Sequence, residues 1–158
     1  MARGYQIMDE PLPGGMAQFA VQPFWPLIAV MFGGTWLSWP WFVFNGFAIG
    51  SPTRRREAVL AACGFVGSIL LILGLDTLSR REILPAESGP YLFLVILVWK
   101  LGVSYWLYAL QSRTFGLYEF YGGTVRNGLI VIVAAYFVRP LVLRPLFEAY
   151  PLLAMALV

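Results

Sequence analysis

The chain has 158 residues, of which 59% are hydrophobic and only 12% charged, and its formal net charge is +3. A soluble domain carries about 25% charged residues, so half that share excludes an ordinary soluble protein, and the high hydrophobicity excludes a disordered chain. The absence of histidine removes His-ligated haem, most zinc sites and histidine general-base catalysis. A single cysteine, Cys63, excludes a disulfide or a multi-cysteine metal site within this chain. The composition therefore predicts an integral membrane protein.

In chain order, the sequence predicts a short polar arm and then one transmembrane domain. Residues 1–22 are rich in proline and glycine and lack the apolar core of a signal peptide. A helix needs about 20 residues to cross about 30 Å of hydrocarbon. Four apolar segments within residues 23–158 meet this need, and we expect helices over residues 24–50, 52–76, 90–111 and 127–149. The predicted fold class is all-α, a four-helix transmembrane bundle.

Turn and breaker residues set the expected boundaries and two irregularities. Ser51-Pro52 predicts the start of the second helix, and Gly89-Pro90 the start of the third. Within the first segment, Pro40 cannot donate a backbone hydrogen bond, so we expect a kink there. Full crossing of this segment is the favoured interpretation, and the alternative is a segment that dips into the membrane and returns, with a cytoplasmic N-terminus. The fourth segment is open to incomplete insertion in the same way.

Arginine counts predict the orientation. The loops at residues 51–57 and 111–126 together hold five arginines: Arg54, Arg55, Arg56, Arg113 and Arg126. The N-terminal arm and the second loop hold three, Arg3, Arg80 and Arg81. The positive-inside rule then places the loops at residues 51–57 and 111–126 in the cytoplasm and, for four crossings, both termini outside.

Lys100 is the first candidate functional residue. It has twelve uncharged residues on each side, from Ser88 to Ser112, and therefore sits near the bilayer midplane. A cation there costs roughly 2.5–3.5 kcal/mol on insertion scales. Three interpretations stay open: a bond to carbonyls or hydroxyls such as that of Ser104, a role in binding an anion or a partner's acid, and snorkelling.

Arg139 and Arg144 are the other candidate ligand- or partner-binding residues. Arg139 lies twelve residues beyond Asn127, about 18 Å along a helix, at a depth close to that of Lys100. No acid occurs at that depth, so we expect compensation by a lipid phosphate, a small anion, water or another subunit's carboxylate. Arg144 and Glu148 are four residues apart and can pair on one face. If the last helix is not fully inserted, both arginines are interfacial.

Small residues predict close helix contacts. Gly46 and Gly50 form a GxxxG pair, and Gly64 and Ser68 form a small-xxx-small pair. Tryptophan and tyrosine favour membrane interfaces, so the aromatic clusters predict an interfacial belt, with a pigment or quinone site as a lesser alternative. The sequence predicts no cofactor and no metal.

The chain has a glycine-rich pattern made of Phe32-Gly33-Gly34, Asn45, Gly50-Ser51-Pro52 with the arginine run behind it, and Gly122-Gly123. This pattern resembles one in small bacterial inner-membrane proteins of no established activity. The likeness covers about half of the chain, and the proline that usually follows the glycine pair is missing. The resemblance implies a bacterial inner-membrane location and this architecture, and implies nothing about mechanism.

Function is predicted less sharply than class. Ser68 and Ser104 have no evident base and no carboxylate pair lies at mid-depth, so an enzyme is not expected. No basic run exceeds Arg54-Arg55-Arg56, which argues against nucleic-acid binding. The favoured hypothesis is a non-catalytic accessory, assembly or anchoring subunit of a membrane complex, whose partners are lipids and other subunits or copies of itself. The alternatives are a small oligomeric transporter or channel for an anion or lipid headgroup, and an inner-membrane protector or defence factor.

Overall fold

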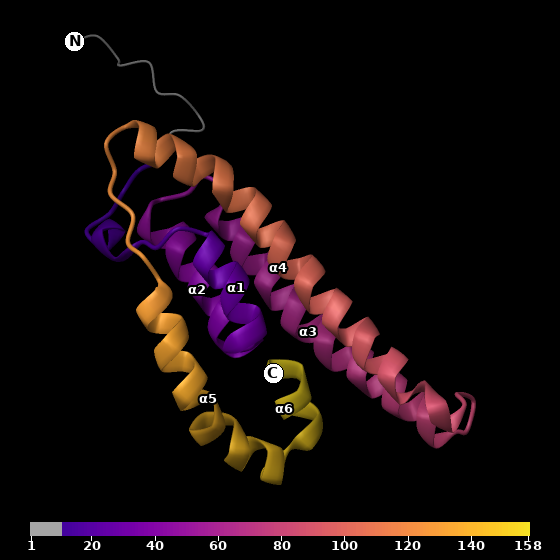
Figure 1. Cartoon of the computed structure of the whole chain (residues 1–158). Coiled ribbons are helices and arrows are strands. Elements are labelled where there is room, and N and C mark those ends of the chain that lie inside the picture. Colours follow the sequence, from indigo (N-terminus) through magenta and orange to yellow (C-terminus); the bar gives the residue numbers. More distant parts are fainter. Residues whose placement is uncertain (1–10) are drawn as a thin grey trace, which may run out of the picture.

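The computed structural model describes residues 11–158, apart from the side chain of residue 86. Every regular element within that range is a helix (Figure 1). In chain order they are η1 (Ala17–Phe19), α1 (Phe24–Phe32), α2 (Thr35–Ala48), α3 (Arg54–Arg80), η2 (Ala86–Ser88), α4 (Gly89–Phe120), α5 (Leu129–Ala149) and α6 (Pro151–Leu157). The all-helical class is confirmed. Three helices, α3, α4 and α5, are long and apolar enough to cross a membrane, so the predicted count of four crossings is not confirmed.

The antiparallel pair of α3 and α4 is the scaffold on which the other helices pack (Figure 1). Helix α4 begins with Pro90 in its first turn, as expected, and continues to Phe120, past the predicted end at residue 111. Helix α3 begins at Arg54, after Thr53, rather than at Pro52. The arginine run therefore lies in the first turn of a helix and not in a loop.

The core lies between α2 and this scaffold. Its buried members are Trp39 and Phe42 of α2, Ala61 of α3, and Val103 and Leu107 of α4. Trp39 and Phe42 belong to an aromatic cluster, with Trp36 and Trp41, that the sequence predicts to lie in the interfacial belt, but both are fully buried. They are buried because the first segment folds as a hairpin, which packs α2 against α3 and α4.

The first apolar segment folds as a helical hairpin and not as one crossing helix. The Ser38 hydroxyl donates to the carbonyl of Pro26 at 2.7 Å, and the Asn45 side chain bonds both the N–H and the carbonyl of Val21. These contacts bring the two halves together antiparallel. At about 1.5 Å per residue, neither α1 nor α2 reaches the 30 Å of a bilayer core. The expected single helix over residues 24–50 is therefore wrong, and the segment has the hairpin shape that the alternative requires.

The hairpin reverses at the glycine pair and not at the proline. Helix α2 continues through Pro40. The shape of this segment is therefore not set by the kink expected at Pro40. Gly34 has φ +96°, which side chains other than glycine rarely adopt. A Cβ on Gly34 would also lie 2.6 Å from the carbonyl oxygen of Leu157. Glycine is needed here both for the turn and for the close approach of α6.

The last predicted helix, residues 127–149, is present as α5 (Leu129–Ala149), and the helical chain is interrupted just after it, at Tyr150. A residue before proline is disfavoured in the helical region, and Tyr150, which precedes Pro151, has φ −143° and ψ 74°. The chain then folds back as α6, whose end reaches the hairpin turn, where the Thr35 hydroxyl donates to the carbonyls of Ala156 and Leu157. In Figure 1 the yellow end of the chain lies beside the turn between α1 and α2. Two interrupted segments thus meet inside the bundle.

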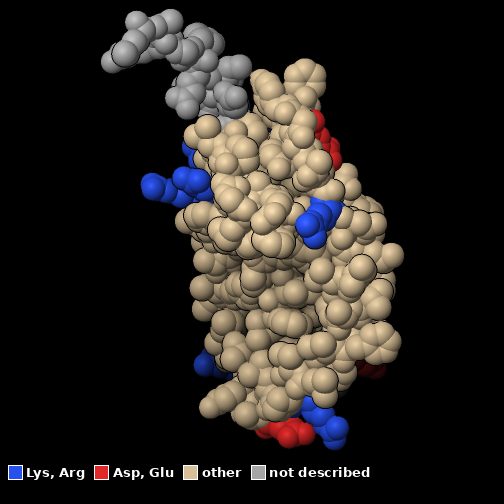
Figure 2. All heavy atoms as spheres, turned by 90° about the vertical axis from the view of Figure 1, so that its left-hand side faces the viewer, with Lys and Arg blue, Asp and Glu red and all other residues tan. Residues whose placement is uncertain are grey.

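Charged residues gather at two ends of the molecule. Figure 2 shows blue and red side chains at both ends and an uncharged band between them on the face in view. Backbone bonds from Arg126 to Ala20 and from Leu12 to Gly50 place the described part of the arm at the end where α3 begins. We call this the arginine-rich end, because it carries Arg54, Arg55, Arg56, Arg113 and Arg126. Arg3 and the rest of residues 1–10 lie outside the described residues.

Candidate functional site

Lys100 lies inside the bundle, on the side of α4 that faces α6. Its residue is only 7% exposed, and its ammonium nitrogen Nζ donates to the carbonyl of Met155 at 2.6 Å. The Ser104 hydroxyl, one turn on, does not hold the ammonium. It donates to the backbone carbonyl of Lys100 and accepts from the indole N–H of Trp39.

Arg139, on α5, is half-buried and makes a similar contact. Its Nη1 donates to the carbonyl of Phe32, the last residue of α1, at 3.2 Å. The last carbonyls of a helix have no intrahelical donor and carry the negative end of the helix dipole. Met155 is in the last turn of α6. The two cations therefore bind the C-terminal ends of the two short helices, which explains why they are tolerated among apolar side chains.

Lys100 and Arg139 line one cavity of about 280 Å³ between α1, α4, α5 and α6. Among the described side chains that line this cavity, these two alone are charged. The rest of the lining is apolar and consists of Val30, Met31, Phe93, Ile96, Leu97, Leu101, Phe147, Met155 and Val158. A second cavity of about 240 Å³ adjoins it, shares Phe93, Ile96 and Met155, and extends to Asp76. The structure thus brings together two of the three predicted ligand-binding residues.

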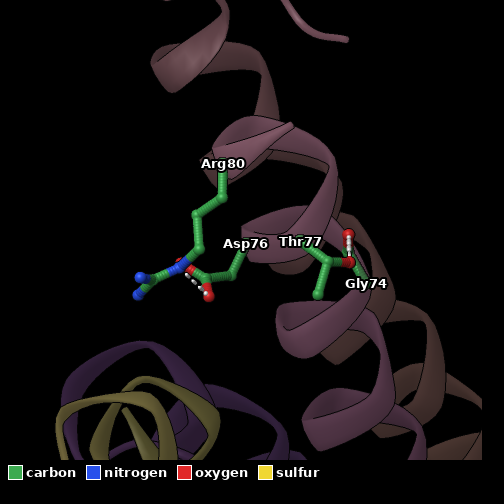
Figure 3. Close-up of polar contacts among 4 residues, drawn as sticks. All are labelled: Gly74, Asp76, Thr77 and Arg80. Carbon is green, nitrogen blue, oxygen red and sulfur yellow. Dashed lines mark hydrogen bonds and ion pairs between the residues drawn. The ribbon is translucent and has the colours of Figure 1, made fainter. Parts of the chain in front are cut away.

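Arg144, the third candidate, lies outside this cavity. Its Nε is 3.6 Å from a carboxylate oxygen of Glu148, and both side chains are largely exposed. Figure 3 shows a similar pair at the end of α3, where Arg80 donates to Asp76 at 2.8 Å, beside the bond of Thr77 to the carbonyl of Gly74. Asp76, which lines the second cavity, and Glu148, which lies on α5, are therefore each paired with an arginine. Neither is free to neutralise Lys100 or Arg139.

A buried carboxylate that sequence reasoning missed lies at the arginine-rich end. Glu57 is fully buried, and its Oε1 accepts hydrogen bonds from the hydroxyls of Ser51 at 2.9 Å and Thr53 at 2.6 Å. Its Oε2 accepts from the Gln111 amide at 2.7 Å. Ser51 and Thr53, a few residues before the first-turn acid Glu57, are a readable sign of polar contacts at the start of a helix.

The small residues predicted for helix packing serve several purposes. A Cβ on Gly46 would overlap Oε2 of Glu57, so this glycine makes room for the buried carboxylate. Gly64 lies against Trp39, and the fully buried Ser68 donates to the carbonyl of Gly64. Gly50 lies beyond the end of α2, with φ +66° and its α-carbon against the Leu12 backbone. Gly50 is therefore a turn residue and not part of a helix–helix GxxxG contact.

The chain matches no protein-family model, no curated protein and no solved structure. The resemblance to small bacterial inner-membrane proteins therefore stays a prediction. Among the described residues, no group of three or more Cys, Asp or Glu is placed to hold a metal ion. The function must be argued from the geometry of this chain.

Proposed function

We propose that this protein is a non-catalytic, multi-pass subunit of a complex in the bacterial inner membrane. The observation that carries the proposal is the outward face of α4. Gly102, Ala109 and Gly116 are exposed and follow one another at intervals of seven residues, which keeps them on one side of the helix. A Cβ placed on Gly102 or Gly116 would meet no other atom within 4 Å. Such small residues let a second helix approach closely.

Two aromatic residues on the same face also favour a protein partner over lipid. Tyr105 and Trp106 are 65% and 61% exposed and lie little more than one turn from Lys100. Among the hydrogen bonds of the described residues, none involves the Tyr105 hydroxyl or the Trp106 indole. The Tyr105 hydroxyl and the Trp106 indole N–H, at the membrane depth proposed for Lys100, have no water to donate to. A hydrogen-bond acceptor from a neighbouring helix would satisfy them.

Native purification in a mild detergent tests the proposal. We expect a mass above that of one chain, with co-purifying subunits that are lost in Gly102→Leu and retained in Gly74→Leu. Gly74 is the matched control, because it too has no atom within 4 Å of its Cβ position but lies on α3. A homo-oligomer would favour the alternative, a small transporter or channel. A partner-free monomer would contradict both.

The orientation that goes with this proposal puts the arginine-rich end in the cytoplasm. Single cysteines at Gly15, Glu87 and Phe120, in a Cys63→Ser background, test it with an impermeant thiol reagent. In intact cells we expect Glu87→Cys to react, and Gly15→Cys and Phe120→Cys to react only after permeabilisation. Four full crossings would put Gly15 and Phe120 on opposite sides, so different labelling of these two sites would contradict the hairpin.

A further inference from the structure

The side chains and helix ends around Lys100 and Arg139 do not balance one another in charge. Each helix C-terminus offsets about half a charge, so the ends of α1 and α6 together offset about one of the two positive charges. The N-terminal end of α2 begins at Thr35 in the same layer and adds about half a positive charge. These groups together leave an excess of more than one positive charge, which an anion in the cavity would offset.

Both cations also keep hydrogen-bond donors for a ligand. The ammonium of Lys100 has three N–H groups, and one of them bonds Met155. The guanidinium of Arg139 has five, and one of them bonds Phe32. Because both side chains line the same cavity, their remaining donors can converge on one anionic group. Hydrogen bonds of this kind, between charged groups, are about twice as strong as neutral ones.

The remainder of the cavity suits a hydrocarbon chain. Beyond the two cations the lining of the first cavity is apolar, and the apolar surface continues past Ile96 along Leu75 and Leu92 of the adjoining cavity, which ends at the polar residues Asp76 and Ser79. Together, the two cavities reach the range of about 300–1,000 Å³ that is typical of ligand sites. Helix α5 packs chiefly on α1 and α6, so the site can be entered sideways between α4 and α5.

We propose that this cavity binds an amphiphile with one negative charge and a single hydrocarbon chain, of the fatty-carboxylate class. The carboxylate lies between Lys100 and Arg139, and the chain runs along Phe93 and Ile96. This inference goes beyond the subunit proposal and does not depend on it, because Lys100 lies on the side of α4 opposite to Gly102. Loss of assembly through the Gly102 face would leave the cavity intact.

The test measures equilibrium binding of labelled palmitate to the full chain in nanodiscs of phosphatidylcholine, with hexadecanol as the uncharged probe of equal length. We expect palmitate to bind at least tenfold more tightly than hexadecanol, and to lose at least about tenfold in affinity in Arg139→Gln. The matched control is Arg144→Gln, on the same helix but outside the cavity, which should change the affinity less than twofold. Leu97→Trp, which fills the cavity and keeps both cations, should also abolish binding.

Each other outcome overturns the proposal. Equal affinities for palmitate and hexadecanol would show that the two cations do not contribute to binding. Equal effects of Arg139→Gln and Arg144→Gln would show a surface effect of net charge. Competition by acetate at the same concentration as palmitate would identify a small-anion site with no place for the chain. The comparison of the two arginine variants decides the matter even if a Lys100 variant fails to fold.

Discussion

Two buried charges of opposite sign are held in different ways in this molecule. Glu57 receives three hydrogen bonds from Ser51, Thr53 and Gln111, and the space beside it is closed by Gly46. Lys100 makes one hydrogen bond from its ammonium and faces a cavity. Buried charges in this molecule are therefore of two kinds. A charge whose hydrogen-bonding capacity is mostly satisfied by the chain itself stabilises the fold. A charge that keeps spare hydrogen-bond donors beside a cavity is available to a ligand.

The same helix physics underlies both sites. Glu57 lies in the first turn of α3, where the positive end of the helix dipole favours an acid. Lys100 and Arg139 bind the carbonyls of Met155 and Phe32, near the negative ends of α6 and α1. Charges are therefore placed where interrupted or starting helices leave unpaired backbone groups. Three variants test how much of the stability depends on each arrangement.

The largest expected effect on stability is at the Glu57 site. In Gly46→Ala the new methyl group would overlap the Glu57 carboxylate and displace it from its donors. We expect a loss of about 3 kcal/mol in the free energy of unfolding, at the upper end of overpacking effects. Denaturation in mixed micelles, followed by circular dichroism, measures it. Gly74→Ala on α3 is the control and should be neutral or stabilising by up to about 1 kcal/mol, because its Cβ position is empty and alanine favours helix. Equal stability of the two variants would mean that the Glu57 site is not tightly packed.

The contrast also shows what the sequence could and could not predict. Lys100 was found because uncharged flanks on both sides fix its depth, and depth is readable along a helix. Glu57 was missed because its burial depends on Gln111, which lies far away in sequence and comes near only when α3 pairs with α4. Composition and hydropathy also predicted the all-helical class, because the length of an apolar segment, like the depth of Lys100, can be read along the chain.

The break of the first segment was predicted only as an alternative. Both Gly33-Gly34 and Pro40 are helix breakers, and local rules gave more weight to the proline. The choice between them depends on α6, whose carbonyl end fills the space beside Gly34. The return of α6 after Tyr150 was not predicted either, because a seven-residue helix has no periodicity to detect. Contacts between distant segments decide such features.

The next largest effect on stability is expected at Lys100, beside the cavity. Lys100→Met keeps the length of the side chain but leaves the Met155 carbonyl without its donor. An unpaired buried polar group costs about 1–3 kcal/mol, and removal of a buried charge offsets part of this, so we expect a loss of about 2 kcal/mol. Thermal denaturation in micelles measures it. Arg144→Met, which removes an exposed charge from α5, should change stability by less than about 0.5 kcal/mol. A Lys100→Met variant that melts no lower than the wild type would show that α6 does not need the ammonium.

The smallest effect should come from the other side chain that holds α6. Thr35 is fully buried, and its hydroxyl bonds the carbonyls of Ala156 and Leu157 at 2.9 and 3.0 Å. Thr35→Val preserves the side-chain shape and removes these bonds, which should cost about 1 kcal/mol. Thr77→Val is the matched control, because its hydroxyl bonds the carbonyl of Gly74 on an exposed part of α3 and its loss should be nearly neutral. Thr35 and Lys100 hold neighbouring carbonyls of one short helix, so the double variant should lose less than the sum of the two single losses once α6 has detached. Strict additivity of the two losses would mean that α6 stays docked without either side chain, and that the apolar contacts of Ala156 with Ile72 and Ile96 hold it in place.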